Sequence, residues 1–386
     1  MLNLFRSRAF ALCFFANLAQ MTSFYLFLHF PGHVTALGAG EQWIGWLVAA
    51  TELASIAASP FVGKWLDAKG RRQVLVVGSV LNVVLCAGFL VATSLLSVFP
   101  LRVLHGVIET ALNVAFFTYA ADLIPRERRS QGFAVFGLSA MGAVGVGAAA
   151  GDIAISIGGY HGIFLSSMAL SLVGMLMVLR LEDKVSHEGD DPDSASHGWI
   201  ATLVRPNLLG VWLLSGALFF AMISVFVFLK TWVGVTGVGT IGWFFAVYSV
   251  TAIVLRIVAG GVPDRVGYVP VALMSLGVYA FGLGLLSLNT GWFVFFAAAF
   301  VCGVAHGFAY PVLLSLVTAR ARQRDQGSAI SIFNMLDDGA ALAAGPALGF
   351  IVETSGYALM FLSSAAVLGI GMAAGGLLLL KFDDSG

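Results

Sequence analysis

Twelve long apolar stretches are the feature of this sequence that most constrains its fold. Breaks at charges, Gly/Pro clusters and polar runs place them at about 9–30, 41–62, 73–95, 98–121, 131–155, 160–180, 207–229, 240–261, 269–289, 291–317, 328–352 and 357–380. A helix needs roughly 20 mostly apolar residues to cross a bilayer. The chain is 59% hydrophobic and only 10% charged, whereas soluble domains carry about 25% charged residues. We therefore expect an all-α membrane protein with twelve transmembrane helices.

The stretches form two sets of six, separated by one long polar and acidic connection near the midpoint. This predicts an N-terminal six-helix bundle at 1–180, a cytoplasmic linker at 181–206 and a C-terminal six-helix bundle at 207–386. Two motifs recur in both halves. A GxxxDxxG pattern stands at 63–70 and again at 260–267, and RRSQGFA at 128–134 matches QRDQGSA at 323–329. Matches at nearly the same offset indicate an internal duplication, which predicts two pseudo-symmetric bundles.

The basic residues predict how the helices are oriented. Seventeen of the 20 Lys and Arg residues fall in the N-terminus, the even-numbered connections and the C-terminus, whereas the opposite side holds only Lys230. Basic residues concentrate on the cytoplasmic side of membrane proteins. We expect a multi-pass protein of the inner (cytoplasmic) membrane with both termini in the cytoplasm.

Several of these segments resemble the major facilitator superfamily of transporters, over essentially the whole chain. GKWLDAKGRR at 63–72 resembles the signature loop of that family between helices 2 and 3, and Arg102-Val-Leu-His-Gly106 resembles its RxxxG motif. Residues 121–129 resemble its exit from helix 4. The resemblance implies two bundles that rock about a central cavity lined by helices 1, 4, 7 and 10, with helices 2, 5, 8 and 11 between the bundles.

The resemblance also implies a conformational latch in the loops that follow helices 2 and 8. Its candidate residues are Gly63, Asp67, Gly70, Arg71, Arg72 and Asp264. Independently of the family, a carboxylate can cap the positive N-terminus of a neighbouring helix. Glycines permit close backbone approach and a tight turn, and basic side chains hold a loop at an anionic leaflet. The alternative interpretation is a positively charged anchor with a turn.

The sequence also departs from the pattern of the proton-coupled exporters in this family. Its fifth stretch reads GAVGVGAAAGD at 142–152, without the proline of GxxxGP, and the proline version stands in the eleventh stretch as Gly345-Pro346. The first stretch has no carboxylate. Export by antiport is the favoured direction, and the departures leave import open.

Ionisable residues inside the apolar stretches are candidate functional groups, because a charge near the middle of a bilayer costs about 2.5–3.5 kcal/mol on insertion scales. The embedded set consists of His29, Glu52, Arg102, His105, Glu109, Asp152, Arg256, His306, Asp337 and Asp338. Acids outnumber Arg and Lys in this set. The excess favours protons or cationic groups over anionic substrates.

The fourth stretch carries a polar stripe. Arg102, His105, Glu109 and Asn113 are spaced three, four and four residues apart, which places them on one helix face. Such a face lines a cavity or meets a partner helix. We expect Glu109 to have a role in the cavity and Arg102 a structural or gating role, with a structural ion pair to another helix as the alternative.

Asp337 and Asp338 are adjacent in the eleventh stretch and point about 100° apart on a helix. Asp338 shares its face with Asn334, and this face is expected to line the cavity as a proton or cation site. Asp337 shares a more apolar face with Phe333, which is expected at the seam between the bundles. There Asp337 could share a proton with Glu52, since like charges that close disfavour double ionisation. For Glu52 a hydrogen bond to a Ser or Thr of a neighbouring helix is the alternative.

Other residues of the expected cavity helices describe the substrate. His306 shares a face with Gly303 and Tyr310, and this face could line the cavity. Phenylalanines on the first, fourth and seventh stretches usually serve packing, but some must line the cavity, which points to a partly apolar organic substrate.

These patterns predict a secondary-active transporter that works by alternating access, with proton-coupled export of small, partly apolar or cationic organic molecules. The alternative is an importer of a nutrient, a metal ion or a metal–chelate complex. No GxxxxGK[ST] motif occurs, which disfavours ATP-driven transport. No nucleophile–base arrangement stands out in the sequence, which disfavours enzymatic activity. No H-x₃-H pair lies within an expected span, so we expect no metal site and no cofactor.

The expected partners are a small-molecule substrate, protons and the bilayer. Because the net charge is zero, no nucleic-acid partner is expected. The chain is also expected to be a monomer.

Overall fold

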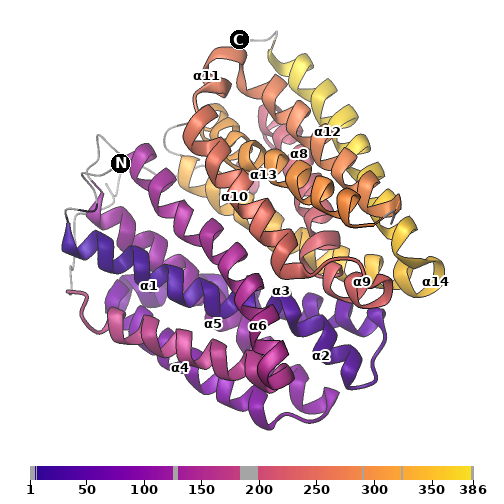
Figure 1. Ribbon diagram of the computed structural model, residues 1–386. Helices are drawn as coiled ribbons and strands as arrows, with labels where there is room; N and C mark the ends of the chain where they lie inside the picture. The colour runs from indigo at the N-terminus through magenta and orange to yellow at the C-terminus, as the bar shows by residue number, and fades with distance from the viewer. Residues whose placement is uncertain are drawn as a thin grey trace. The chain divides into compact units, whose positions relative to one another are not determined.

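The structure is a computed structural model that describes residues 5, 7–124, 129–182, 199–288, 291–322 and 325–383. Every regular element in these ranges is a helix (Figure 1). In chain order they are α1 (Arg8–Tyr25), the 3-10 helix η1 (Leu26–His29), α2 (Phe30–Ala36), α3 (Glu41–Lys69), α4 (Arg71–Val91), α5 (Leu95–Leu123), α6 (Arg129–Val178), α7 (Trp199–Leu203), α8 (Pro206–Phe226), α9 (Leu229–Thr236), α10 (Ile241–Ala259), α11 (Val262–Val266), α12 (Tyr268–Leu288), α13 (Trp292–Arg320) and α14 (Gln326–Asp383).

The described residues contain 10 helical segments long and apolar enough to cross a membrane. Two of these are double, because Val135–Val178 holds 44 residues and Gln326–Lys381 holds 56. Non-helical glycines interrupt α6 at Gly158 and Gly159, and α14 at Gly356. Each long helix therefore makes two crossings. This confirms the expected twelve-helix, all-α membrane fold, and the breaks fall beside the expected starts at 160 and 357.

The first span is longer than expected. It continues through η1 and α2 to Ala36, whereas the apolar pattern suggested an end near residue 30. His29 and His33 therefore lie four residues apart on one span, so the expectation that no H-x₃-H pair lies within a span is wrong. His29 Nε2 donates to the carbonyl oxygen of Ala148 at 3.0 Å. Within the described residues, no group of three or more His, Cys, Asp and Glu side chains is placed to hold a metal ion.

The chain divides into two compact units. The first contains residues 1–40, 50–187 and 240–249, and the second contains 41–49, 188–239 and 250–386. The start of α3 thus belongs to the second unit and the start of α10 to the first. Residues 183–198, most of the expected linker at 181–206, lie outside the described residues. The expected boundaries at 180 and 207 stay a prediction.

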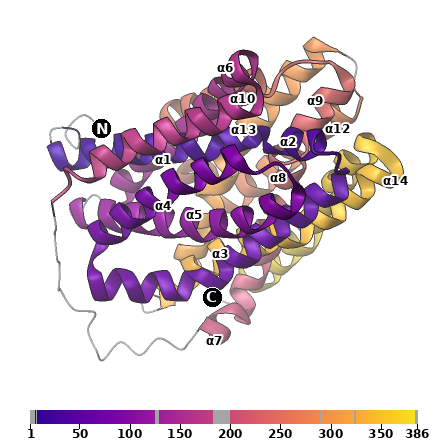
Figure 2. The ribbon, with the colours of Figure 1, turned by 90° about the horizontal axis from the view of Figure 1, so that it is seen from below.

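In the first unit, α4 packs against both α5 and α6, and α1 packs against α6 (Figure 2). Buried polar side chains link these helices. Asn82 Nδ2 donates to Gln20 Oε1 at 3.1 Å, Gln20 Nε2 donates to the carbonyl oxygen of Ser171 at 3.1 Å, and Ser23 and Ser167 hydroxyls lie 2.7 Å apart. Hydrogen bonds between helices help hold bundles together in a bilayer, where no hydrophobic force acts between apolar faces.

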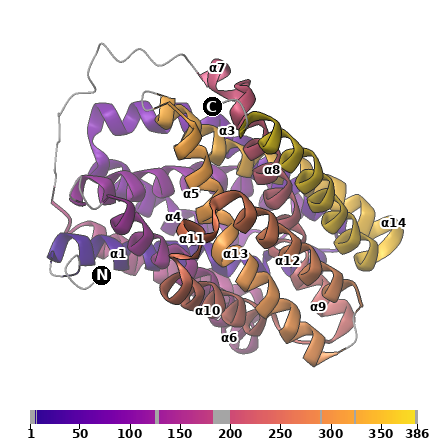
Figure 3. The ribbon, with the colours of Figure 1, turned by 90° about the horizontal axis from the view of Figure 1, so that it is seen from above.

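In the second unit, α14 packs against α8 and α12, and α12 also packs against α13 (Figure 3). Small residues bring α8 and α14 together. A Cβ atom added to Gly210 would lie 2.8 Å from the carbonyl oxygen of Gly375, and the reverse distance is also 2.8 Å. Close crossings at small residues are common in membrane helices because they let backbones meet.

The duplicated GxxxDxxG motifs share one backbone feature. Gly70 ends α3 with φ 83° and ψ 158°, and Gly267 ends α11 with φ 102° and ψ 144°. Residues with a Cβ atom rarely adopt this conformation. The tight turn expected at Gly70 is confirmed, and its repeat at Gly267 matches the pseudo-symmetry of the two halves.

Candidate substrate and proton site

Arg102, His105 and Glu109 lie next to one another along α5, as their spacing predicted. Arg102 Nη1 is 2.9 Å from His105 Nδ1, and His105 Nε2 is 3.9 Å from Glu109 Oε2. A guanidinium can only donate, so Nδ1 accepts and the ring hydrogen of a neutral His105 sits on Nε2. That N–H is on the side of the Glu109 carboxylate. The three side chains form a short polar chain along one helix face.

The exposure of the side chains changes sharply along this row of three residues on α5. The His105 side chain is 2% exposed, whereas the Glu109 side chain is 47% exposed. Asn113, one turn further along α5, is also exposed. Arg102 is half-buried and lies within electrostatic reach of both Glu109 and Glu52. Glu109 therefore forms the accessible end of a stripe whose other end is enclosed.

Aromatic rings enclose the end of the stripe formed by Arg102 and His105. The Phe24 ring stacks on His105 with centroids 5.1 Å apart, and Phe27 approaches the same ring edge-on at 4.5 Å. The Arg102 guanidinium lies 4.8 Å above the centre of the Phe30 ring, a cation–π geometry. All three Phe side chains are buried, so this end of the stripe is packed inside the first unit.

Gly106 explains the RxxxG pattern in this chain. A Cβ atom at Gly106 would overlap the carbonyl oxygen of Thr51 in α3. The absence of a side chain lets α3 and α5 meet beside Glu52, which is half-buried. The hydroxyls of Ser55 and Thr110 are hydrogen-bonded at the same crossing. Glu52 is thus held on a fixed crossing within the first unit.

A second candidate group lies in the second unit. The His306 ring is buried on α13, with its centroid 6.2 Å from that of Tyr310. The Tyr310 ring lies 5.3 Å from Phe333 of α14, and Asp337 is within electrostatic reach of Tyr310. Arg256 Nε donates to the carbonyl oxygen of Gly307 at 3.1 Å, and its charge acts on His306 and Tyr310.

The two adjacent aspartates differ in exposure. Asp337 and Asn334 are exposed, and Asp338 is half-buried. Phe333, which shares the face of Asp337, is fully buried against Phe219 and Tyr310. The apolar face therefore packs as its pattern suggested, yet the carboxylate at its edge is the more exposed of the two. The expected roles of Asp337, Asp338 and Glu52 stay predictions.

The loop that follows α3 is fastened within the first unit. Arg71 Nε is 3.1 Å from Asp122 Oδ2 at the end of α5, and Arg72 Nη2 donates to the carbonyl oxygen of Leu179 at 3.1 Å. The side chain of Asp67 lies outside the described residues. In the second unit, the Tyr268 hydroxyl donates to Asp264. The latch role of these residues stays a prediction.

Gly63 has open space around it in this structure. A Cβ on Gly63 would meet no atom within 4 Å beyond its own stretch of helix, and its latch role stays a prediction. The close approach occurs at the other end of α3. A Cβ on Gly45 would overlap the carbonyl oxygen of Gly345, and one on Gly349 would lie 2.7 Å from the carbonyl oxygen of Glu41.

Glu41 is a polar centre that the sequence reasoning missed. Its Oε2 accepts from Thr231 Oγ1 at 3.0 Å and its Oε1 accepts from Tyr357 Oη at 2.9 Å, all within the second unit. The first unit holds a counterpart, where Asp152 Oδ2 accepts the Gly242 N–H at 2.8 Å. In each unit an acid thus fixes the start of one helix, α3 or α10. The available signal was Gly345-x₃-Gly349, a spacing typical of close helix crossings.

Comparisons with known proteins agree with this architecture. The family model of the Major Facilitator Superfamily matches residues 10–240 and 235–385. The chain belongs to the Major Facilitator Superfamily, whose members are membrane transporters.

Individual relatives are distant. An uncharacterized MFS-type transporter of Escherichia coli (strain K12), YhhS, is 22% identical over 355 residues, which cover 89% of this chain and 85% of that protein. The crystal structure of the nucleoside transporter NupG is 12% identical with a TM-score of 0.79, covering 96% of this chain and 99% of that chain. A POT family transporter in complex with 5-aminolevulinic acid is 14% identical with a TM-score of 0.77, covering 97% and 96%. These structures share the fold.

Proposed function

We propose that this transporter exports small, partly apolar or cationic organic molecules across the inner membrane in exchange for protons. The observation that carries the proposal is the Arg102–His105–Glu109 chain on α5, which ends in an accessible carboxylate inside a membrane span. Placing a carboxylate inside a membrane span costs free energy, so such a residue is a candidate functional group. Phe24, Phe27 and Phe30 are buried around the other end and hold His105 and Arg102 in position.

The mechanism that we propose is alternating access of two halves, 1–180 and 207–386. Protons from outside neutralise Glu109 and one carboxylate of the Asp337–Asp338 pair, and loss of the protons to the cytoplasm frees the carboxylates to bind a cationic group. His105 takes part as a positioning residue, because Arg102 fixes its tautomer. The substrate crosses without chemical conversion. We place both termini in the cytoplasm and expect the chain to work as a monomer.

The test uses the purified chain in proteoliposomes. A thermal-shift screen of organic cations and amphiphiles in detergent selects the substrate, with ethidium as the first probe. An acidic lumen is then imposed, and ethidium fluorescence with trapped DNA reports uptake. Antiport predicts accumulation in the acidic lumen and dissipation of the pH gradient, absent from protein-free liposomes. With the gradient reversed, accumulation in an alkaline lumen would support the import alternative. Transport that neither uses nor dissipates a gradient of either sign would contradict proton coupling.

Glu109→Gln is the informative variant. It keeps the shape of the side chain and removes the titrating group, so we expect gradient-driven uptake to fall to the protein-free level while substrate binding remains measurable by thermal shift. Glu182→Gln is the matched control, because the same chemical change is made at an exposed residue outside the spans. Full gradient-driven uptake by Glu109→Gln would show that this carboxylate does not carry the proton.

A further inference from the structure

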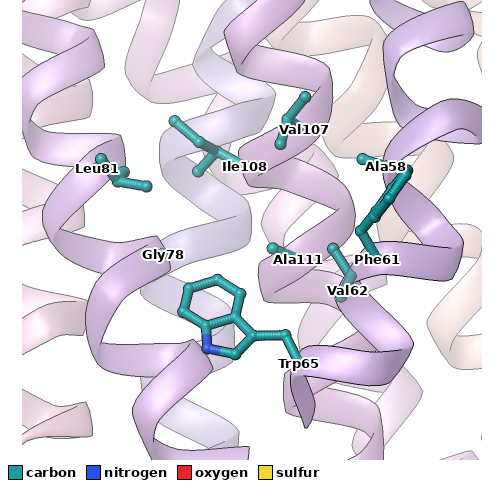
Figure 4. A pocket seen from close by; sticks show the side chains of 9 residues that line it. All are labelled: Ala58, Phe61, Val62, Trp65, Gly78, Leu81, Val107, Ile108 and Ala111. Carbon is teal, nitrogen blue, oxygen red and sulfur yellow. The ribbon is translucent and has the colours of Figure 1, made fainter. Parts of the chain in front are cut away.

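The first unit has an apolar groove that the transport proposal does not use. It encloses about 390 Å³ between α3, α4 and α5 (Figure 4). The α3 wall is formed by Ala58, Phe61, Val62 and Trp65. The last three stand three, four and seven residues after Ala58, a spacing that places all four on one helix face. Gly78 and Leu81 form the α4 wall, and three residues of α5 close the back.

The surroundings of the groove are hydrocarbon. All three helices that line it are candidate membrane spans. Phe61 is 72% exposed at the rim, and the nine lining residues are apolar apart from the indole nitrogen of Trp65. In Figure 4 the Trp65 ring extends from α3 toward Gly78. Because the lining is apolar except for the indole nitrogen of Trp65, a hydrocarbon chain matches the groove better than a polar ligand would.

One end of the groove carries positive charge. Lys64 directly precedes Trp65, and Lys69 stands four residues further, about 6 Å along the helix. Both lysines are exposed. Arg71 and Arg72, which begin α4, are turned to Asp122 and to the Leu179 carbonyl. Lysine side chains at the end of a span reach the phosphate level of the membrane. The groove therefore leads from the interior of the membrane to two ammonium groups.

We propose that this groove binds one acyl chain of an anionic phospholipid, whose phosphate is held by Lys64 and Lys69. The apolar walls select a hydrocarbon chain but not a head group. The charge selects the head group, because a lysine near an anionic lipid surface contributes about 1 kcal/mol, roughly fivefold in affinity. Trp65 lies at the level where amphipathic rings are enriched in membrane proteins.

Native mass spectrometry of the full chain in detergent tests this proposal. Phosphatidylglycerol and phosphatidylethanolamine with identical acyl chains are titrated separately, and the first bound lipid is counted. We expect phosphatidylglycerol to bind roughly 10-fold or more tightly than phosphatidylethanolamine, from about fivefold for each lysine. Equal binding of the two lipids by the unmodified chain would overturn the proposal, and this result requires no variant to fold.

Two variants distinguish the contribution of the lipid head group to binding from that of the acyl chain. Lys64→Gln with Lys69→Gln should abolish the preference for phosphatidylglycerol and leave binding of phosphatidylethanolamine unchanged. Ala58→Phe should fill the groove and weaken the binding of both lipids. Lys230→Gln and Leu172→Phe, made outside the groove, are the matched controls. A preference that survives the double lysine variant, or a groove-filling variant that binds both lipids normally, would contradict the assignment.

Discussion

The backbones of Gly45 and Gly345 touch. A Cβ on Gly45 would overlap the carbonyl oxygen of Gly345, and a Cβ on Gly345 would lie 2.7 Å from the carbonyl oxygen of Gly45. Both residues belong to the second unit, although most of α3 belongs to the first. This single crossing therefore fixes the start of α3 to α14.

The crossing predicts a difference between two glycines of the same helix. Gly45→Ala should lower stability by about 1–3 kcal/mol, because the added methyl group must displace backbone. Gly63→Ala, with open space around it, should be neutral or stabilise by up to about 1 kcal/mol, as alanine is the better helix former. Thermal unfolding in detergent measures both, and equal effects would contradict the crossing.

The Glu41 carboxylate should couple energetically to Tyr357. Hydrogen bonds to charged groups contribute about 1.5–3 kcal/mol, so Glu41→Gln and Tyr357→Phe should each destabilise the protein. A double-mutant cycle should show coupling, because Glu41→Gln removes the negative charge that strengthens the 2.9 Å hydrogen bond and Tyr357→Phe removes its donor. Glu182→Gln, at an exposed position outside the spans, serves as the control. Additive effects of Glu41→Gln and Tyr357→Phe would mean that the hydrogen bond does not contribute.

His105 should matter for stability through Arg102. His105→Phe keeps a ring against Phe24 and Phe27 but removes the acceptor of the Arg102 hydrogen bond. A buried donor left without its partner costs about 1–3 kcal/mol. His105→Asn, whose amide oxygen can still accept from Arg102, should cost less. Unfolding measurements that rank the two variants in the opposite order would contradict this arrangement.

The duplicated turns should respond alike to substitution. Gly70→Ala and Gly267→Ala each force a Cβ into a backbone conformation with positive φ, which costs about 1–3 kcal/mol. Gly284→Ala in α12, where the structure leaves open space, is the control. A loss at one turn only would show that the two repeats do not share this backbone geometry in the folded protein.

The stripe on α5 could be predicted from the sequence because it is local. The spacing of Arg102, His105 and Glu109 sets their common face, whatever packs around them. Its enclosed end could not be predicted, since the aromatic rings come from α1, η1 and α2. The exposures of Asp337 and Asp338 depend in the same way on neighbours, because helix geometry separates two adjacent residues without saying which one is covered.

By itself, the sequence determined the twelve spans and their arrangement in two similar halves. In hydrocarbon every backbone polar group must be hydrogen-bonded, and a stretch of roughly 20 apolar residues achieves this within itself as a helix, so its length and apolarity indicate a crossing helix. The tertiary structure decided which helices meet and which acids they enclose. Thr231 and Tyr357, the partners of Glu41, are 190 and 316 residues away along the chain. Contacts at that separation depend on how the helices fold together, which no local pattern encodes.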